Sequence, residues 1–396
     1  MKWRLEKISD FCRTGSGGTP SRKKMSQYYS GTIPWVKSGE LREAIITSTE
    51  ESITDIALKE TSAKLIPSGA LLVAMYGATI GRIAILGIEA ASNQAVCHIV
   101  PDLDIADQRY LFYALRQQVS GWLEQSVGGA QPNINQQIIK ETKIPLPPLE
   151  EQKRIAAILD KADRIRRKRQ EAIRLTEELG RSIFLDMFGD PIAQGWKMVK
   201  VGDVAAKSKN SMRTGPFGSN LLHSEFVDEG IPVLGIDNAV RNRFLWAKPR
   251  FITPEKYEQL KNYTVYPEDV IITIMGTCGR CAIIPNNCPT AINTKHLCCI
   301  TTNKEVCLPE FLYGYFLFHP IAKQYFERNT KGAIMDGLNQ TIIKGLPIPL
   351  APIDLQHKYK EAIQKLNFLE VKTNNHFGNS ENLFNSLLQR AFRGEL

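Results

Sequence analysis

The chain has 396 residues, with 50 lysines and arginines against 41 acidic residues, and the resulting net charge of +9 favours a polyanionic partner, although a membrane surface would also suit it. Its first residues, MKWRLEKISDF, lack an apolar signal core, and its most apolar window, 70–86, contains Arg82 and two glycines. We therefore expect neither export nor a membrane span, and we predict a cytoplasmic chain of two or three domains whose eight cysteines are free thiols.

Residues 1–148 predict a mixed α/β domain. Short apolar runs at 70–75 and 82–86 are bounded by glycine or proline, which is typical of strands in a buried sheet. Residues 105–124 favour a helix. Polar loops connect these elements, and such loops are where binding side chains usually lie.

Residues 149–190 predict one long central helix. Pro145, Pro147 and Pro148 disfavour helix just before it, and the sequence GDP at 189–191 ends it. About 39 residues at ~1.5 Å each give a rod of roughly 60 Å. Its apolar residues keep three- and four-residue spacing, so they form one stripe that needs a partner: Ile155, Leu159, Ala162, Ile165, Ala172, Leu179, Ile183 and Met187.

A second domain at 191–351 and a second long helix at 352–396 follow the same plan. Apolar runs at 270–275 and 281–284 predict strands, and 309–328 predicts one helix with an aromatic face. The last helix carries a similar apolar stripe, made of Tyr359, Ile363, Leu366, Leu369, Phe377, Phe384, Leu388 and Phe392. Two rods of like length favour an antiparallel coiled coil, and packing of each rod on another subunit is the alternative.

The two halves of the chain form an internal repeat. IPLPPLEEQ at 144–152 recurs as IPLAPIDLQ at 348–356, and Asn135 recurs as Asn339, each 204 positions later. Gly81-Arg82 recurs as Gly279-Arg280 at an offset of 198. Each half is therefore a globular domain followed by a long helix. An antiparallel pair of such halves has a pseudo-two-fold axis, which matches the backbone dyad of a DNA duplex.

Five motifs carry a resemblance to a known family: GGTPS at 17–21, IPWVKSGEL at 33–41, MYGATIGR at 75–82, PLPPLEEQKRIAAILD at 145–160 and RAFRGEL at the end of the chain. Over its whole length the chain resembles the DNA-specificity subunit of Type I restriction-modification systems. The resemblance implies two target-recognition domains, each reading one half of a split site in double-stranded DNA. It also implies two modification subunits with adenine methyltransferase chemistry, and restriction subunits. S-adenosylmethionine, ATP and magnesium are expected on those partners, and no cofactor is expected on this chain.

The repeat separates two classes of candidate DNA-binding residue. Arg82 and Arg280 are shared by both halves and cannot by themselves distinguish two half-sites, so we expect them to serve folding, phosphate contact or subunit docking. Discrimination is expected where the halves differ, at side chains that suit base edges or phosphates. The candidates in the first domain are Arg22, Lys23, Lys24, Lys37, Arg42, Tyr76, Gln131 and Asn133. Those in the second are Lys207, Lys209, Arg213, Asn220, Arg241, Asn242 and Arg243. Any one of them alone could equally be a solvated surface group.

Two further patterns have competing interpretations. The run KADRIRRKRQ at 161–170 either follows DNA phosphates, forms the charged outer face of a coiled coil, or docks an acidic partner. The motif CGRC at 278–281 suggests zinc. The repeat, however, aligns Cys278 with Ile80 and Cys281 with Ile83, so we interpret these cysteines as apolar strand positions and predict no metal.

The sequence contains no G-x-x-x-x-G-K-[ST] phosphate loop, no H-E-x-x-H and no Asp/Asn-Pro-Pro-aromatic motif, so we predict a non-catalytic chain. Two alternatives from other classes remain. The first is a self-sufficient DNA methyltransferase or nuclease, which methylation of DNA by the chain alone would favour. The second is a protein-binding adaptor, which would lack salt-dependent binding to duplex DNA.

Overall fold

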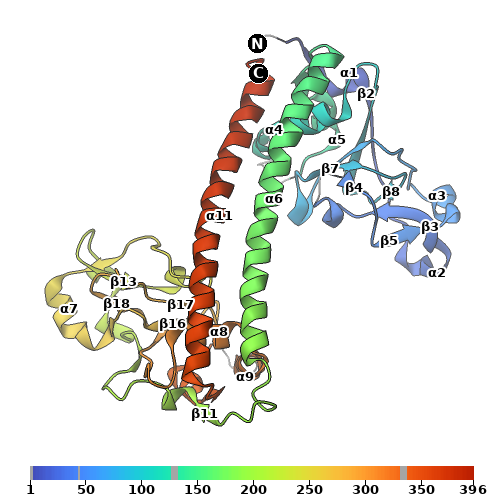
Figure 1. Ribbon diagram of the computed structural model, residues 1–396. Coiled ribbons are helices and arrows are strands. Elements are labelled where there is room, and N and C mark those ends of the chain that lie inside the picture. The colour runs from blue at the N-terminus through green and yellow to red at the C-terminus, as the bar shows by residue number, and fades with distance from the viewer. Residues whose placement is uncertain (1–2, 43–44, 126–132, 331–336) are drawn as a thin grey trace. The chain divides into compact units, whose positions relative to one another are not determined.

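The computed structural model describes residues 3–42, 45–125, 133–330 and 337–396. The chain divides into two compact units, unit 1 with Met1–Gln170 and Asn375–Leu396, and unit 2 with Glu171–Asn374. Two helices are continuous over about forty residues each, α6 (Leu149–Phe188) and α11 (Ile353–Arg393). Each of them contributes one part to unit 1 and the other part to unit 2 (Figure 1).

Unit 1 is a mixed α/β fold built on two sheets. The first sheet has the order β2 (Cys12–Ser16), β9 (Val96–Pro101), β6 (Leu71–Ala74), β7 (Ile83–Leu86) and β4 (Ile45–Ile46). The second has the order β5 (Glu51–Ile53), β3 (Tyr29–Val36) and β8 (Ala91–Ser92), and β1 (Leu5–Lys7) pairs with β10 (Lys143–Pro145). The α-helices before α6 are α1 (Ile8–Phe11), α2 (Met25–Tyr28), α3 (Asp55–Glu60), α4 (Gln108–Gln125) and α5 (Gln136–Glu141).

Unit 2 repeats this topology except at the sheet edges, where its described residues form no counterpart of β4 and add one strand, β15 (Thr264–Val265). Its first sheet has the order β12 (Met212–Thr214), β19 (Leu297–Ile300), β16 (Val270–Thr273) and β17 (Cys281–Ile283). Its second has the order β14 (Phe251–Ile252), β13 (Ile231–Leu234), β18 (Ala291–Asn293) and β15 (Thr264–Val265), and β11 (Met198–Lys200) pairs with β20 (Pro347–Pro349). β3 pairs with β8 in parallel, as β13 does with β18, whereas the paired central strands β6–β9 and β16–β19 are antiparallel. The α/β fold class and the internal repeat are thus confirmed.

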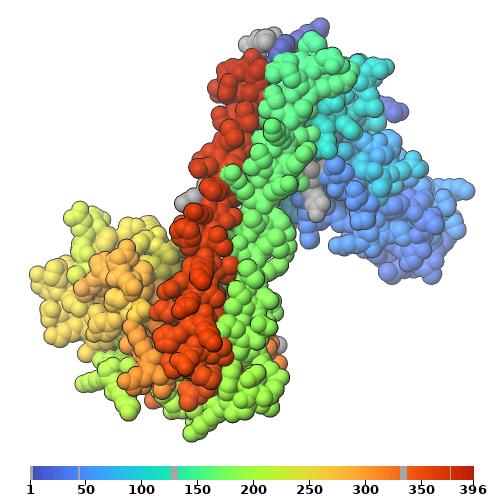
Figure 2. All heavy atoms as spheres, viewed as in Figure 1, coloured from blue at the N-terminus to red at the C-terminus, as the bar shows by residue number. Residues whose placement is uncertain are grey.

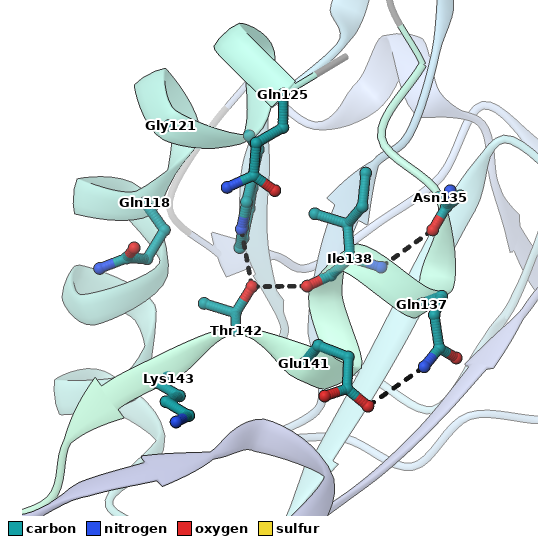
Figure 3. A pocket seen from close by; sticks show the side chains of 10 residues that line it. Gln118, Gly121, Gln125, Asn135, Gln137, Ile138, Glu141, Thr142 and Lys143 are labelled. Carbon is teal, nitrogen blue, oxygen red and sulfur yellow. Dashed lines mark hydrogen bonds between the residues drawn. The ribbon is translucent and has the colours of Figure 1, made fainter.

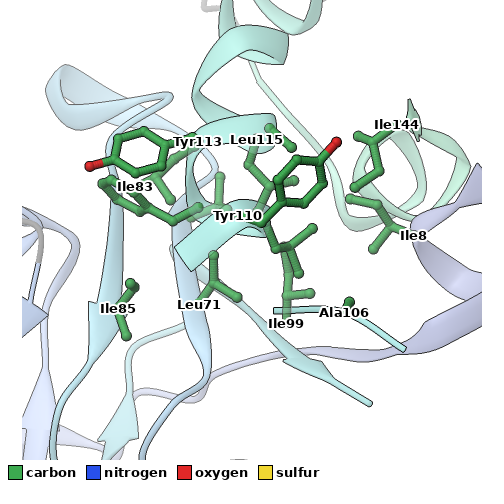
Figure 4. Packing of buried hydrophobic residues seen from close by; sticks show 14 of the residues in the cluster. Ile8, Leu71, Ile83, Ile85, Ile99, Ala106, Tyr110, Tyr113, Leu115 and Ile144 are labelled. Carbon is green, nitrogen blue, oxygen red and sulfur yellow. The ribbon is translucent and has the colours of Figure 1, made fainter. Parts of the chain in front are cut away.

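The central strand of the first sheet in unit 1, β6, is apolar without interruption because both of its faces are buried. Leu71 and Val73 belong to the cluster that packs under α4, whereas Leu72 and Ala74 point to a second cluster on the opposite face. In the first cluster, Tyr110 of α4 lies among isoleucines from several strands (Figure 4). The Tyr110 hydroxyl donates to the Pro145 carbonyl oxygen at 2.7 Å, so this large side chain is buried without an unpaired polar atom.

The single helix predicted at 309–328 is in fact two, α8 (Pro309–Phe318) and α9 (Pro320–Thr330). Pro320 has no backbone donor, and its ring disfavours helical backbone at the residue before it. His319 accordingly adopts an extended conformation with φ −73° and ψ 131°. The helix at 105–124 contains no proline and continues unbroken as α4.

The repeated prologue of the long helices is explained by a buried glutamine. The Gln152 side chain is fully buried, where its Oε1 accepts from the Asp107 backbone N–H at 2.9 Å and its Nε2 donates to the Ile105 and Pro147 carbonyl oxygens. Gln356, also fully buried, makes the same three bonds in unit 2, with Leu308, Val306 and Ala351. Each glutamine therefore ties the first turn of a long helix to the loop ahead of α4 or α8.

Within each unit the two long helices run antiparallel. In unit 1, Arg154 donates to the Leu396 carbonyl oxygen at 2.9 Å, while Arg169, fifteen residues further along α6, donates to the Ser380 hydroxyl. In unit 2, a Cβ on Gly180 would lie 3.0 Å from Leu366 Cδ2, so this glycine allows a close approach of the helices. Four residues further along α6, the Phe184 ring lies 5.4 Å from the ring of Tyr359, which comes seven residues before Leu366 on α11. The predicted antiparallel pairing of the two helices is therefore present in both units.

The apolar stripes of these helices are only partly buried. Ile155 and Tyr359, near the starts of their helices, are buried against the globular domains. Towards the middle, Ile165, Leu179 and Leu369 are 41%, 50% and 54% exposed. One helix can cover only one side of its neighbour, so these side chains remain open to solvent.

The basic run at 161–170 splits into two faces. Asp163, only 3% exposed, lies between the guanidinium groups of Arg116, Arg166 and Arg167, with N–O distances of 3.5, 2.9 and 2.6 Å. Burial opposes the charge of Asp163, but the three guanidinium groups outweigh burial and lower the pKa of its carboxyl. The outward face carries Lys161, Arg164 and Lys168, all exposed.

In the part of the chain that the structure describes, every helix is too short or too polar to span a lipid bilayer.

Candidate nucleic-acid interface

The first predicted basic cluster is joined by acidic residues. Arg22 pairs with Glu51 at 2.8 Å and lies over the Tyr29 ring at 4.3 Å, and the Lys37 ammonium bridges Glu50 and the same Glu51 at 2.8 and 3.1 Å. The Arg22 hydrogen bond lowers the pKa of Glu51, so the carboxylate stays charged. Arg22 is still about half exposed, and a surface pair of this kind is weak enough to be exchanged for a phosphate.

Three further predicted cations of this domain, Lys23, Lys24 and Arg42, differ in whether they already have a partner. Lys24 donates to the Tyr28 hydroxyl at 3.0 Å and lies 3.8 Å from Glu60. Lys23 is exposed and makes no ion pair with any described residue. Arg42 is exposed and donates to the Gly39 carbonyl oxygen at 2.9 Å. Lys23 is therefore the member of the cluster that needs no rearrangement to meet a phosphate.

A glycine loop between β6 and β7 brings three further candidates into one region. Gly77 and Gly81 have φ values of +79° and +77°, a backbone conformation that favours glycine. Tyr76 at the start of the loop is 36% exposed and forms an isolated β-bridge with Asn133, and Arg82 is exposed at its end. Gln131 lies outside the described residues. The structure thus joins Tyr76 and Asn133, which are far apart in sequence.

The equivalent loop of unit 2 is one residue shorter but likewise has a positive-φ glycine near each end. Gly276 and Gly279 have φ values of +73° and +82°, Met275 forms the corresponding bridge with Gly337, and Arg280 is exposed. The remaining candidates of this unit on the surface are Lys207, Lys209, Asn220 and Arg241, which are exposed, and Arg243, which pairs with Glu370 at 2.8 Å.

Arg213 does not belong to a DNA-reading surface, and we correct that prediction. Its side chain is only 4% exposed and pairs with Asp269, which is fully buried. It also donates to the Thr264 carbonyl oxygen at 2.7 Å and to Thr301 at 3.1 Å. Asp269 in turn accepts from the Tyr266 backbone N–H at 2.7 Å. Every polar group of this pair is thus used inside the domain, and Arg213 is a structural residue.

In unit 1, three other residues occupy the positions that correspond to Arg213, Asp269 and Cys299. In the β2–β9 pairing Gly15 lies opposite His98, and in the β12–β19 pairing Arg213 lies opposite Cys299. A Cβ on Gly15 would be 2.5 Å from His98 Nε2, so a larger residue there does not fit. Ala70 precedes β6 where Asp269 precedes β16. The set Gly15, Ala70 and His98 is therefore exchanged in unit 2 for Arg213, Asp269 and Cys299.

Asn242 and Arg280, which are 38 positions apart in sequence, line one open basin in unit 2. Its charged lining also includes Arg181 of α6, and Lys323 and Glu327 of α9. Sequence reasoning missed Arg181 and Lys323 because neither stands near a loop motif or a cation cluster of the globular domain.

The cysteines of CGRC behave as packing residues. Cys281 is fully buried in β17 with its Sγ 3.8 Å from the Tyr313 carbonyl oxygen, and Cys278 contacts the Ile274 carbonyl oxygen at 3.3 Å. Burial raises the pKa of Cys281, and it raises that of Cys298 to about 12, which disfavours the thiolate that zinc requires. Among the residues described, no three His, Cys, Asp or Glu side chains gather as a metal site.

A hollow of about 400 Å³ in unit 1 lies between α4 and α5 (Figure 3). The one hydroxyl group among its described lining residues is engaged in two hydrogen bonds: Trp122 Nε1 donates to the Thr142 hydroxyl at 2.8 Å, and that hydroxyl donates to the Ile138 carbonyl oxygen at 2.7 Å. Its carboxylate, Glu141, is held by Lys7 at 2.5 Å. The lining residues therefore do not pair a nucleophile with a base.

Comparisons with known proteins all point to one family. The model of the Type I restriction modification DNA specificity domain matches residues 1–175 and again 193–376. A curated relative, the Type I restriction enzyme MjaIX specificity subunit of Methanocaldococcus jannaschii, is 25% identical over 92% of this chain and 86% of its own length.

Two solved structures share the fold. The S subunit of a Type I restriction-modification system from M. genitalium matches with a TM-score of 0.60 at 16% identity, over 99% of this chain and 96% of that one. A chain solved in work on complex assembly and conformational transition of the type I R-M system matches with a TM-score of 0.55 at 20% identity, over 100% and 98%.

Proposed function

The chain belongs to the family of Type I restriction-modification DNA specificity proteins, and from this premise we propose that it reads a split DNA site on behalf of a methyltransferase and a nuclease. It acts in the cytoplasm as a non-catalytic subunit. The modification subunits bind S-adenosylmethionine and transfer its methyl group to adenine, and the restriction subunits use ATP and magnesium. The chain itself supplies recognition of the sequence and a scaffold.

The observation that carries this proposal is the repetition of one fold with unlike surface residues. Both units place a glycine loop after the central strand, ending in Arg82 or Arg280. Around that shared frame the side chains differ: unit 1 presents Lys23 on a short helical turn, whereas unit 2 presents Arg241 on a loop. Shared cations suit phosphates and unlike side chains suit unlike bases, so the two units recognise two different half-sites.

Exposed apolar residues on the long helices support two modification subunits per chain. Ile165 and Leu179 on α6 are 204 positions from Leu369 and Leu383 on α11, the offset of the repeated prologue. All four are more than 40% exposed. The face of both helices seen in Figure 2 is open to solvent. Equivalent apolar positions on two helices fit two copies of one partner.

Replacement of Leu179 by glutamate is expected to release one modification subunit from the assembly, and replacement of Leu383 as well is expected to release both. Burying a leucine contributes about 1.5–3 kcal/mol to an interface, and a carboxylate at that place adds an uncompensated desolvation cost. Native mass spectrometry of the assembled complex gives the stoichiometry. Leu103→Glu is the matched control, because Leu103 is 65% exposed on the globular part of unit 1. Full assembly by the double variant would contradict this docking site.

The proposed function is tested by mapping methylated adenines in cells that express this chain with a modification subunit. We expect the methylated adenines to lie in one asymmetric site made of two unlike half-sites. We also expect this methylation to be absent when the chain is not expressed. Purified complex should bind duplex DNA with an affinity that falls steeply with salt. Methylation by this chain alone would instead indicate a self-sufficient enzyme, and salt-independent or absent binding by the complex would indicate a protein adaptor.

A further inference from the structure

The basin in unit 2 combines an aromatic floor with a basic rim. Its open volume is about 740 Å³, and the buried rings of Phe316 and Phe326 line it, which we call its floor. The rim comprises the glycine loop with Arg280, Lys323 of α9, and Arg181 of α6. Asn242 lines it from a further loop, where the Tyr313 hydroxyl donates to the Asn242 carbonyl oxygen.

The basin results from the break between α8 and α9. In unit 1, where α4 is unbroken, a Cβ on Gly81 would meet Val119 Cγ1 at 2.6 Å, so the helix closes directly onto the glycine loop. In unit 2 the nearest atom to a Cβ on Gly279 is Phe326 Cδ2 at 3.8 Å. The interruption at Pro320 therefore leaves beside the second glycine loop a space that helix packing fills in unit 1.

The cations of the basin are not neutralised by neighbours. Arg181, Arg280 and Lys323 are exposed, and none makes an ion pair with a described residue. Among the described lining residues there is one carboxylate, Glu327, against these three cations, an excess of two positive charges. Most predicted cations of the first cluster are paired, whereas these three can receive an anion without first breaking an ion pair.

We propose that the basin holds a backbone phosphate of the DNA at the half-site read by unit 2, an assignment that rests on the proposed function. Guanidinium groups bind phosphate oxygens through paired, charge-assisted hydrogen bonds. Because Arg280 has an identical counterpart in Arg82, it carries no information about which half-site is bound, which fits a contact to phosphate and not to a base. The loop that carries Asn242 is already held in place, since its neighbour Arg243 pairs with Glu370 of α11 at 2.8 Å.

The test uses the complete complex of this chain with its modification subunits, titrated with cognate and with unrelated duplex at several salt concentrations. Arg280→Gln, Lys323→Gln and Arg181→Gln are each expected to weaken both duplexes by the same factor, roughly tenfold. The slope of log affinity against log salt should fall in each single variant, by at most about 1, because the three cations share one phosphate. The methylated sequence should not change. Arg328→Gln, an exposed cation on α9 that does not line the basin, is the matched control and should leave affinity and slope unchanged.

Three other outcomes would overturn the assignment. If a basin variant binds DNA with unchanged affinity but loses a modification subunit, an acidic surface of that partner occupies the basin. Weaker binding to the cognate duplex alone, with a changed methylated base, would show that these side chains read bases. Absence of salt-dependent binding by the wild-type complex would remove the proposed function itself, and because wild type is measured in the same titration, this failure is distinguishable from the other two.

Discussion

Replacement of Asp269 by alanine is expected to destabilise unit 2 by about 3–5 kcal/mol, because the Arg213 guanidinium would remain buried without its counter-charge. The Asp269 carboxylate is fully buried and also accepts from the Tyr266 backbone N–H. The Asp269→Ala variant would leave this N–H without its acceptor as well. Urea unfolding followed by tryptophan fluorescence and circular dichroism measures the change in stability. Glu258→Ala, which removes an exposed partner of Lys261, is the matched control and should change stability little.

The exchange of residue sets between the units sharpens this prediction. If Arg213, Asp269 and Cys299 are replaced together by glycine, alanine and histidine, unit 2 receives the set that packs in unit 1. We expect this triple variant to recover most of the stability that Asp269→Ala removes, because replacing both members of a buried ion pair eliminates the unpaired charge. A triple variant as unstable as the single one would show that the two units do not share interchangeable cores at this point.

Insertion of four residues into α6 next to Glu177, with a matching insertion into α11 next to Leu369, is expected to lengthen the spacer of the recognised site. Four helical residues add about 6 Å, which corresponds to roughly two base pairs at 3.4 Å each. Both half-site sequences should stay the same, since neither globular part is altered. Mapping of methylated adenines gives the new spacer directly.

Glu177→Ala serves as the control for this experiment, because it changes the same exposed position without changing the length of the helix. It should leave the site unchanged. A recognised site with its original spacer after the paired insertion would contradict the role of the long helices as the element that fixes half-site spacing.

The candidate interface was only partly predictable from residue types. Lys23 and Arg280 are exposed cations without ion pairs to described residues, as expected of side chains that meet DNA. Arg213 belongs to the same residue class but is buried, and no local feature of its sequence distinguishes it. Arg181 lies on a helix almost 100 positions from Arg280, and only the packing of α6 beside the glycine loop places both on one basin.

The amino-acid sequence is sufficient to predict the features that depend on short-range backbone and side-chain patterns. These are the repeat, the apolar strands, the helix ends set by proline and glycine, and the family motifs. The break at Pro320 was also predictable, since proline acts on its immediate neighbours. The folded chain is needed to learn which polar residues are buried and which apolar ones are exposed. Burial depends on contacts between segments far apart in the chain, as between Arg213 and Asp269, or on the absence of such contacts, as at Leu179.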